Sequence, residues 1–164
     1  MEGGPLIRRA TPADSGAIVA ITRELIADGG VFPHAPEETD DALRAFWYAP
    51  HGHLFVAEAD GAVAGAYVFK PNQPGRGAHV ANAAYAVAGR FRGRGLGEAM
   101  GRHSLDEARR AGFRAMQYNL VVSTNGPAVA LWQKIGFVVL CRLPEAFLHP
   151  TRGYVDALVM HRFL

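Results

Sequence analysis

An arginine- and glycine-rich stretch near the middle of the chain has the composition of an anion-binding turn. It reads Val87-Ala88-Gly89-Arg90-Phe91-Arg92-Gly93-Arg94-Gly95-Leu96-Gly97 and joins an apolar segment to an amphipathic one. Glycines let the backbone curl and let a ligand approach without a Cβ in the way. If a helix opens here, its first N–H groups are unpaired and its dipole favours an anion. With three arginines adding positive charge, the turn predicts a pyrophosphate-binding cradle.

Two other phosphate-binding motifs do not fit this turn. It has no third glycine or alanine at the spacing of the dinucleotide-binding motif. It also lacks the Gly-Lys-Ser/Thr of a Walker loop. The alternative to a phosphate site is a tight strand-to-helix connection with surface arginines.

The apolar periodicity on either side of the turn predicts the elements that position it. The predicted strands are residues 6–9, 53–58, 62–70, 78–87, 115–122, 137–142 and 154–163. The predicted helices are residues 12–29, 36–48, 93–112 and 126–135. This order predicts a single domain over residues 1–164 of the α/β (α+β) class, with a mixed sheet and helices on both faces.

Composition narrows the function classes. The chain has 164 residues, 49% of them apolar and 20% charged, with a net charge of +2. These values fit one globular domain and disfavour nucleic acid and membrane as partners. The single cysteine, Cys141, excludes a disulfide within the chain and disfavours a thiolate metal site, so no metal is expected. We expect Cys141 to be buried in a strand and the protein to be cytoplasmic, since no targeting segment is recognised.

Two stretches resemble motifs of the GNAT (GCN5-related N-acetyltransferase) superfamily. Arg92-Gly93-Arg94-Gly95-Leu96-Gly97 resembles motif A, whose pattern is Gln/Arg-x-x-Gly-x-Gly/Ala. Residues 125–137 resemble motif B, in which an Asn opens the last helix and a Gly-Phe pair leads into the next strand. Residues 70–82 and 153–160 resemble one bacterial and fungal branch of the family. The resemblance implies an acyl-CoA N-acyltransferase fold with a mostly antiparallel central sheet, acetyl-CoA as cosubstrate and a primary amine as acceptor.

The resemblance also assigns residues to the coenzyme. Backbone groups of a bulged strand before motif A would pair with the pantetheine arm, the turn would hold the pyrophosphate, and an Asn would contact the arm. The residues at these positions are Tyr85, Ala86, Val87, Arg92, Gly93, Arg94, Gly95, Leu96, Gly97, Glu98 and Asn125. Trp132 stands where many relatives have a tyrosine proposed as the acid for the leaving thiolate. Indole N–H cannot serve as that acid, so Trp132 is expected in the core and the cofactor wall.

The catalytic groups are less defined, because residues 81–85 lack the Glu that relatives often place there. His79 is the nearest group with a pKa near neutral, and Tyr85 and Asp156 are further candidates. Asn82 and Asn119 are polar residues on apolar strands, and we expect Asn119 to line the cleft. Each of these residues also has a purely structural interpretation, and a water chain could carry the proton instead.

The acceptor is interpreted as a small-molecule amine or an amino acid. A protein or peptide N-acetyltransferase and a non-catalytic coenzyme A-binding sensor are the alternatives. The loops at residues 30–34, 71–77 and 143–153 are expected to shape the acceptor pocket, because loops on a rigid scaffold carry specificity. The resemblance also implies a homodimer, which many members of the family form, and the sequence leaves the oligomeric state open.

Overall fold

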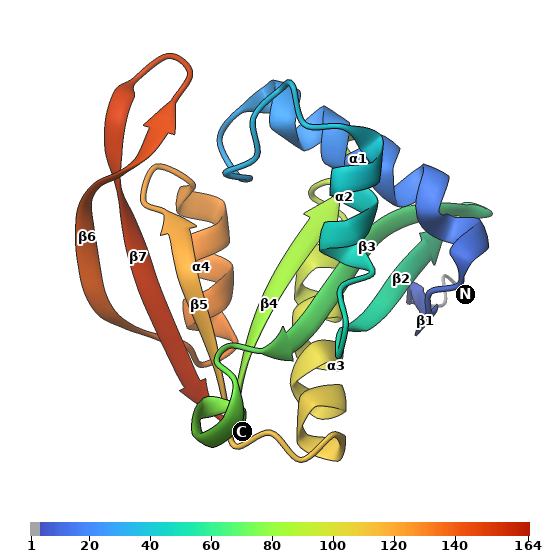
Figure 1. The fold of residues 1–164 in the computed structure, drawn as a ribbon. Coiled ribbons are helices and arrows are strands. Elements are labelled where there is room, and N and C mark those ends of the chain that lie inside the picture. The colour runs from blue at the N-terminus through green and yellow to red at the C-terminus, as the bar shows by residue number, and fades with distance from the viewer. Residues whose placement is uncertain (1–3) are drawn as a thin grey trace.

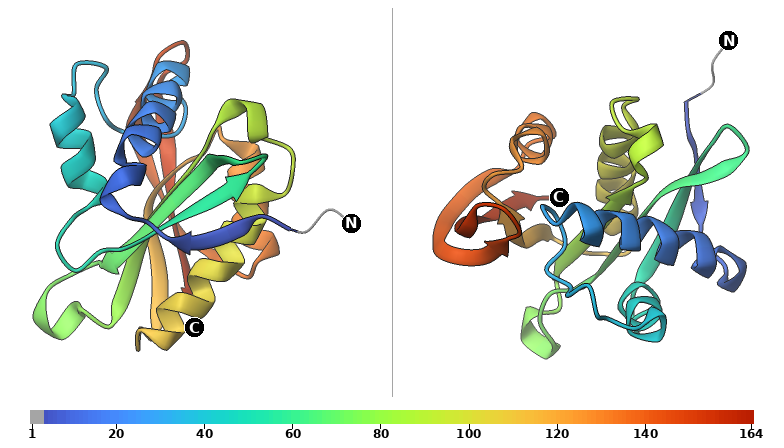
Figure 2. Two further views of the ribbon diagram at one scale, coloured as in Figure 1. Left: turned by 90° about the vertical axis from the view of Figure 1, so that its right-hand side faces the viewer. Right: turned by 90° about the horizontal axis from the view of Figure 1, so that it is seen from above.

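The computed structural model of the protein describes residues 4–164. Within these residues, one seven-stranded sheet lies between two layers of helices (Figure 1; Figure 2, right). The helices are α1 (Ser15–Asp28) and α2 (Asp40–Trp47) on one face, and α3 (Leu96–Arg110) and α4 (Gly126–Lys134) on the other. The strands are β1 (Leu6–Arg9), β2 (His53–Ala59), β3 (Ala62–Pro71), β4 (Val80–Val87), β5 (Ala115–Val122), β6 (Val138–His149) and β7 (Gly153–Phe163). The predicted mixed sheet with helices on both faces is confirmed.

The strand order is β1-β2-β3-β4-β5-β7-β6, and every neighbouring pair is antiparallel except β4 and β5. The backbone ladder of this parallel pair has two residue pairs, Val80 with Ala115 and Ala81 with Met116. Beyond those pairs the two strands diverge (Figure 1). The sheet therefore has a central gap that opens toward the carboxyl ends of β4 and β5.

Several elements begin or end away from their predicted limits, each for a local reason. The third helix begins at Leu96 rather than at residue 93, because Gly93 and Gly95 have positive φ angles of 75° and 77°. The second helix begins at Asp40 rather than at residue 36, since the Thr39 side chain caps it by accepting a hydrogen bond from the Ala42 N–H. A 3₁₀ turn over Pro12–Asp14 precedes α1.

The predicted loop at residues 143–153 is wrong for most of its length. β6 continues through this segment to His149, and only the tight turn before Gly153 separates it from β7. β6 stays paired with β7 along this extension because a register shift between Leu143 and Phe147 accommodates the residues that β6 has in excess of β7.

The expectation that Cys141 is buried is also wrong. Cys141 is exposed because β6 is the last strand of the sheet and pairs only with β7. Most of its side chains face solvent on both sides of the sheet.

The two helices behind the gap pack closely. A Cβ at Gly101 of α3 would lie 2.9 Å from Ile135 Cδ1 and 3.1 Å from Trp132 Cζ3. Glycine at this position therefore lets α3 and the end of α4 approach each other, which places Trp132 against the face of the sheet that these helices cover.

No helix in the described part of the chain is both long and apolar enough to cross a bilayer.

Candidate active site

The glycine-rich turn has the backbone conformation that an anion cradle requires. Gly95, in the left-handed region, is the N-cap of α3, and a Cβ at Gly93 or Gly95 would meet nothing within 4 Å. The first helical bond runs from the Ala99 N–H to the Gly95 carbonyl. The N–H groups of Leu96, Gly97 and Glu98 precede it, so they belong to the unpaired first turn that binds anions in other helices.

Acidic side chains hold two of the predicted phosphate-binding arginines. Arg92 Nη2 lies 2.7 Å from Asp28 Oδ2, and Arg94 Nη1 lies 2.6 Å from Asp60 Oδ2. The Arg94 hydrogen bonds lower the pKa of Asp60. Both pairs are exposed and anchor the turn to α1 and to the β2–β3 hairpin. Asp28 consequently competes with any phosphate for Arg92.

The structure restricts what Glu98 and Gly89 can contribute. The Glu98 carboxylate accepts hydrogen bonds from Lys134 and Arg102, which lower its pKa, so only the backbone N–H of Glu98 remains for an anion in the turn. Gly89 donates its N–H to Glu24 Oε1 at 2.6 Å. A Cβ at this position would overlap the same Glu24 oxygen, so glycine lets the carboxylate of α1 approach the turn this closely.

A cavity of about 320 Å³ occupies the gap between β4 and β5. Its wall on the side of α3 and α4 includes Gly97, Leu131 and Trp132, and its wall on the side of α1 and α2 includes Phe32 and Phe46. The lining residues are Val31, Phe32, Pro33, Phe46, Asn82, Ala83, Ala84, Tyr85, Val87, Gly97, Tyr118, Asn119, Leu120, Val121, Val122, Asn125, Ala128, Leu131 and Trp132. The cavity therefore reaches both faces of the sheet.

Backbone groups of β4 face this gap. The Ala88 N–H donates to the Ala64 carbonyl of β3, so by alternation the backbone of Ala86 also faces β3, and that of Tyr85 and Val87 faces β5. The expected bulge is not present, because β4 pairs with β3 without a register shift from Gly65–Val87 to Pro71–Ala81. The divergence of the strands frees the groups of Tyr85 and Val87 without one.

Two tyrosines and a tryptophan form the floor of the cavity. The Tyr85 hydroxyl lies 2.7 Å from Ser104 Oγ and 2.9 Å from the Tyr118 hydroxyl. Burial raises the pKa of Tyr85 to about 12, against the lowering effect of these two hydrogen bonds, and raises that of Tyr118 well above its usual value. The Trp132 ring lies 4.7 Å from that of Tyr85. Both hydroxyls are protonated at neutral pH, so neither is a base there.

Carboxamide side chains form the polar part of the lining. Asn119 Nδ2 donates to Asn72 Oδ1 at 2.7 Å, and Asn119 Oδ1 accepts from Gln117 Nε2 at 3.0 Å. Asn82 Nδ2 donates to the Gln117 carbonyl at 2.9 Å. Asn125 accepts from the Ala128 N–H at 3.3 Å and so caps α4 at the edge of the cavity. Asn82 was not assigned to the site from sequence, although its polarity on an apolar strand was the available signal.

The structure does not bring His79 and Asp156 to the cavity. His79 precedes β4 at the closed end of the gap, where its carbonyl accepts from the Arg114 N–H. Asp156 accepts from Arg142 Nη1 at 2.9 Å and from the Glu145 N–H at 3.0 Å, and these bonds lower its pKa. Neither residue lines this cavity or the second one beside it.

The second cavity, of about 440 Å³, shares Val31, Tyr85, Val87 and Asn125 with the first and also contacts Arg92. The loop after α1 and the β6–β7 turn meet above it. A Cβ at Gly29 would lie 2.4 Å from Pro150 Cγ. The loop at residues 30–34, predicted to shape the pocket, contributes Val31, Phe32 and Pro33, which were missed as individual residues.

Comparison with known proteins decides the family. The model of the acetyltransferase (GNAT) family matches residues 19–137. The chain belongs to the GNAT family. A solved GCN5-related N-acetyltransferase from Kribbella flavida is 47% identical to this GNAT chain, with a TM-score of 0.92 and 98% of each chain covered. A putative acetyltransferase from Salmonella typhimurium, solved with its cofactor acetyl-CoA, is 25% identical with a TM-score of 0.88, covering 99% of this chain and 95% of the other.

Curated relatives of this GNAT chain are matched in part. N-acetyltransferase aca1 of Schizosaccharomyces pombe is 35% identical over 96 residues, which are 58% of this chain and 46% of that protein. Mycothiol acetyltransferase of Paenarthrobacter aurescens is 32% identical over 124 residues, which are 70% of this chain and 38% of that protein. The chain thus spans less than half the length of these two relatives.

Proposed function

We propose that this chain is an acetyl-CoA-dependent N-acetyltransferase that transfers the acetyl group directly to a primary amine of a small molecule or amino acid. The observation that carries the proposal is the cavity in the gap between β4 and β5, beside the N-terminus of α3. The family and the Salmonella typhimurium structure with acetyl-CoA support it.

The coenzyme would lie on the side of α3 and α4. The N–H groups of the turn from Gly93 to Glu98 would bind the pyrophosphate, and Arg92 would add charge there after yielding its contact with Asp28. The backbone of Tyr85 and Val87 would pair with the pantetheine arm, as an added strand pairs with a sheet edge. The open space beside Gly93 and Gly95 fits such a ligand.

The chemistry needs a neutral amine, a stabilised oxyanion and a departing thiolate. A thiol with a pKa of about 8.5 leaves as thiolate without a strong acid, which agrees with Trp132 in place of the usual tyrosine. No Asp, Glu, His, Lys or Arg of the described residues lines the first cavity. We therefore infer that water takes the amine proton, while the Asn119 carboxamide positions the acceptor by hydrogen bonding.

The size of the cavity favours a small acceptor over a folded protein. Pockets that enclose drug-sized molecules have volumes of about 300–1,000 Å³. The cavity of about 320 Å³ must hold both the acetyl end of the coenzyme and the acceptor. The contact between Gly29 and Pro150 also narrows the approach on one side.

The test measures coenzyme A release from acetyl-CoA with amines, amino acids and short peptides at about pH 8, where a useful fraction of the amine is neutral. Mass spectrometry of the acetylated product identifies the acceptor. We expect amine-dependent release by the intact chain, and a loss of about 10-fold or more in Asn119→Ala, because a hydrogen bond to the acceptor is removed. Because Cys141 is exposed and would react with thiol reagents, each assay needs an acceptor-free blank.

The outcomes separate the alternatives. Release with peptides but not with small amines would support the peptide acetyltransferase. Acetyl-CoA binding without turnover on any acceptor would support the sensor module. No binding of acetyl-CoA would refute the proposal.

We also propose a homodimer formed through β6 and β7. Of the eight large apolar side chains exposed among the described residues, six lie on these two strands: Val138, Val139, Leu140, Leu148, Tyr154 and Phe163. An apolar surface of this kind marks an interaction site in many soluble proteins. Light scattering after size-exclusion chromatography would give the mass of a dimer, and a monomer at all concentrations would contradict the proposed dimer.

The cytoplasmic location expected from the sequence stays a prediction.

A further inference from the structure

The half of the first cavity that faces α1 and α2 is uncharged. Val31, Phe32, Pro33 and Phe46 supply apolar surface there, and the polar groups are carboxamides. An isolated charge buried in such surroundings is costly unless a partner compensates it. An acceptor with a charged group besides its amine therefore needs an opposite charge at the mouth of the cavity.

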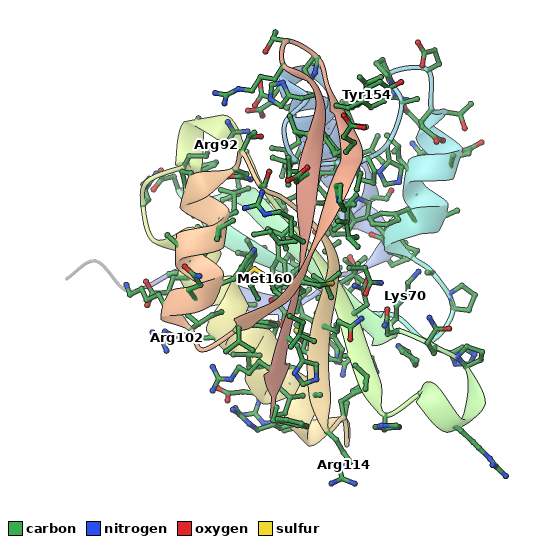
Figure 3. The ribbon with its side chains drawn as sticks, turned by 90° about the vertical axis from the view of Figure 1, so that its left-hand side faces the viewer. Lys70, Arg92, Arg102, Arg114, Tyr154 and Met160 are labelled. Carbon is green, nitrogen blue, oxygen red and sulfur yellow. The ribbon has the colours of Figure 1, made fainter. Side chains whose placement is uncertain are left out.

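Lys70 is a cation next to this half of the cavity, although it does not itself line the cavity. It lies on β3 directly opposite Asn82 in the β3–β4 register, and its Nζ lies 6.0 Å from the centroid of the Phe46 ring. Both neighbours line the cavity. Figure 3 shows Lys70 on the side of the sheet that carries α2, opposite the side on which Arg92 lies. The ammonium group is thus beside the acceptor half and away from the phosphate turn.

The ammonium of Lys70 has no carboxylate partner among the described residues, and its side chain is half-buried. The other lysine of the chain, Lys134, forms an ion pair with Glu98 at 2.5 Å. A half-buried cation that packs on an aromatic ring and has no carboxylate partner retains its capacity to bind an anion.

Two carboxamides lie near this cation along β3 and β4. Asn72, two residues after Lys70, accepts from Asn119 at its Oδ1, which leaves its Nδ2 group as a donor. Asn82, the register partner of Lys70, donates one of its two Nδ2 hydrogens to the Gln117 carbonyl. Amide N–H groups and an ammonium together are the groups that bind a carboxylate. The same surroundings contain no acidic lining residue for a second ammonium.

We propose that Lys70 determines acceptor specificity by binding a carboxylate of the acceptor, so that the acceptor class is an amino acid rather than a plain amine or a polyamine. This inference rests on the proposed acetyltransferase function. The acceptor would place its amine toward the coenzyme, its side chain against Phe32 and Phe46, and its carboxylate toward Lys70.

The experiment compares acceptors that differ only in the carboxylate. Leucine, leucinamide and isopentylamine form one series, and phenylalanine, phenylalaninamide and 2-phenylethylamine form another. With the intact chain, kcat/KM should be highest for one of the two amino acids. Lys70→Met should lower kcat/KM for that amino acid by about 10- to 100-fold, the effect of losing one hydrogen bond to a charged group, and should leave its amide unchanged.

Two further variants serve as controls. Lys70→Arg keeps the charge and should retain most of the discrimination. Arg109→Met removes an exposed cation of α3, which pairs with Asp106 away from both cavities, and should change nothing. Acetyl-CoA affinity, measured by calorimetry, should be equal in all four proteins, which also shows that each variant folds.

The results distinguish a failure of the role of Lys70 from a failure of the proposed acetyltransferase function. Turnover that is equal for acid, amide and amine, or equal losses on all three in Lys70→Met, would overturn the role of Lys70 while leaving the transferase intact. Acetyl-CoA binding with no turnover on any acceptor would overturn the proposed function itself, and the role of Lys70 with it.

Discussion

At the scale of single residues, hydrogen-bond partners decide which candidates can move a proton. The Tyr85 hydroxyl is shared between Ser104 and Tyr118, and its pKa is about 12. It stays protonated below that pH and can donate a hydrogen bond but not act as a base. His79 and Asp156 lie outside both cavities.

Tyr85→Phe tests this assignment. Loss of the hydroxyl should lower kcat/KM by about 10-fold, because the floor of the cavity loses a hydrogen-bonded anchor. The shape of the pH profile between about pH 6 and pH 9 should not change, since the hydroxyl does not titrate there. Steady-state rates across that range provide the measurement.

Tyr67→Phe is the matched control. Tyr67 is also a buried tyrosine, its hydroxyl lies 2.6 Å from His103 Nδ1, and it lines neither cavity. The kcat/KM of the Tyr67→Phe variant should match that of the unmodified chain. If Tyr85→Phe removes the basic limb of the profile and Tyr67→Phe does not, Tyr85 titrates during turnover and the assignment is incorrect.

At the scale of elements, the two ends of α3 offer a direct comparison. Gly95 at its start and Gly112 beyond its end both have positive φ, 77° and 89°, and a Cβ at either meets nothing within 4 Å. An alanine at each should cost about 1 kcal/mol of unfolding free energy, because the left-handed region disfavours a Cβ. Only Gly95 belongs to the proposed pyrophosphate cradle.

Gly95→Ala should therefore raise the KM for acetyl-CoA several-fold, and Gly112→Ala should leave it unchanged. Urea denaturation measures the shared loss of stability, and initial rates at varied acetyl-CoA measure the difference. Equal KM values in the two variants would show that the turn does not approach the coenzyme.

Local sequence patterns predict the limits of some helices and strands correctly, but not all of them. β1 and β5 have their predicted limits, because turn-forming residues stand close to both ends of each segment. Asn125 opens α4 as predicted, because a side-chain cap is a local interaction. The extension of β6 and the exposure of Cys141 depend on which strand is last in the sheet, and residue periodicity does not contain that information. His79 was placed by proximity in sequence, whereas the gap opens at the other end of β4.

At the scale of the whole molecule, a charged cluster joins the first strand to the first helix and to β2. Arg8 donates to Asp14 at 2.9 Å and to Glu58 at 2.8 Å, and Asp14 also accepts from the Thr11 N–H at 2.7 Å. The Arg8 hydrogen bond is the largest cause of the lowered pKa of Asp14, whose side chain is only 8% exposed. The cluster ties the N-terminal strand to the rest of the fold.

A lowered folded-state pKa stabilises the protein above the unfolded pKa, which is about 4 for aspartate, and the contribution is lost as the pH falls below it. Asp14→Asn should cost about 2 kcal/mol of unfolding free energy at neutral pH, because Arg8 and Thr11 lose a charged acceptor. The variant should also lose less stability than the unmodified chain between about pH 5 and pH 2.

Urea denaturation over this pH range makes the comparison. Asp41→Asn is the control, because the Asp41 side chain is 93% exposed in its pair with Arg44 and should contribute almost nothing. Parallel pH curves for Asp14→Asn and the unmodified chain would show that Asp14 is not the group responsible.

The two residue pairs that join β4 to β5 have a consequence for motion. Because the central ladder has two residue pairs and the other links between β4 and β5 are side-chain hydrogen bonds, we expect the cleft to open there by a sub-global fluctuation while the ladders on either side stay intact. Amide hydrogens of Tyr85 and Val87, which face the gap, should exchange with solvent deuterium faster than that of Ala86, which faces β3. Added coenzyme A should slow the first two and leave the third unchanged, as NMR exchange rates would show. The short ladder between β4 and β5 would then be the flexible part of the sheet, and a ligand bound in the gap would make it more rigid.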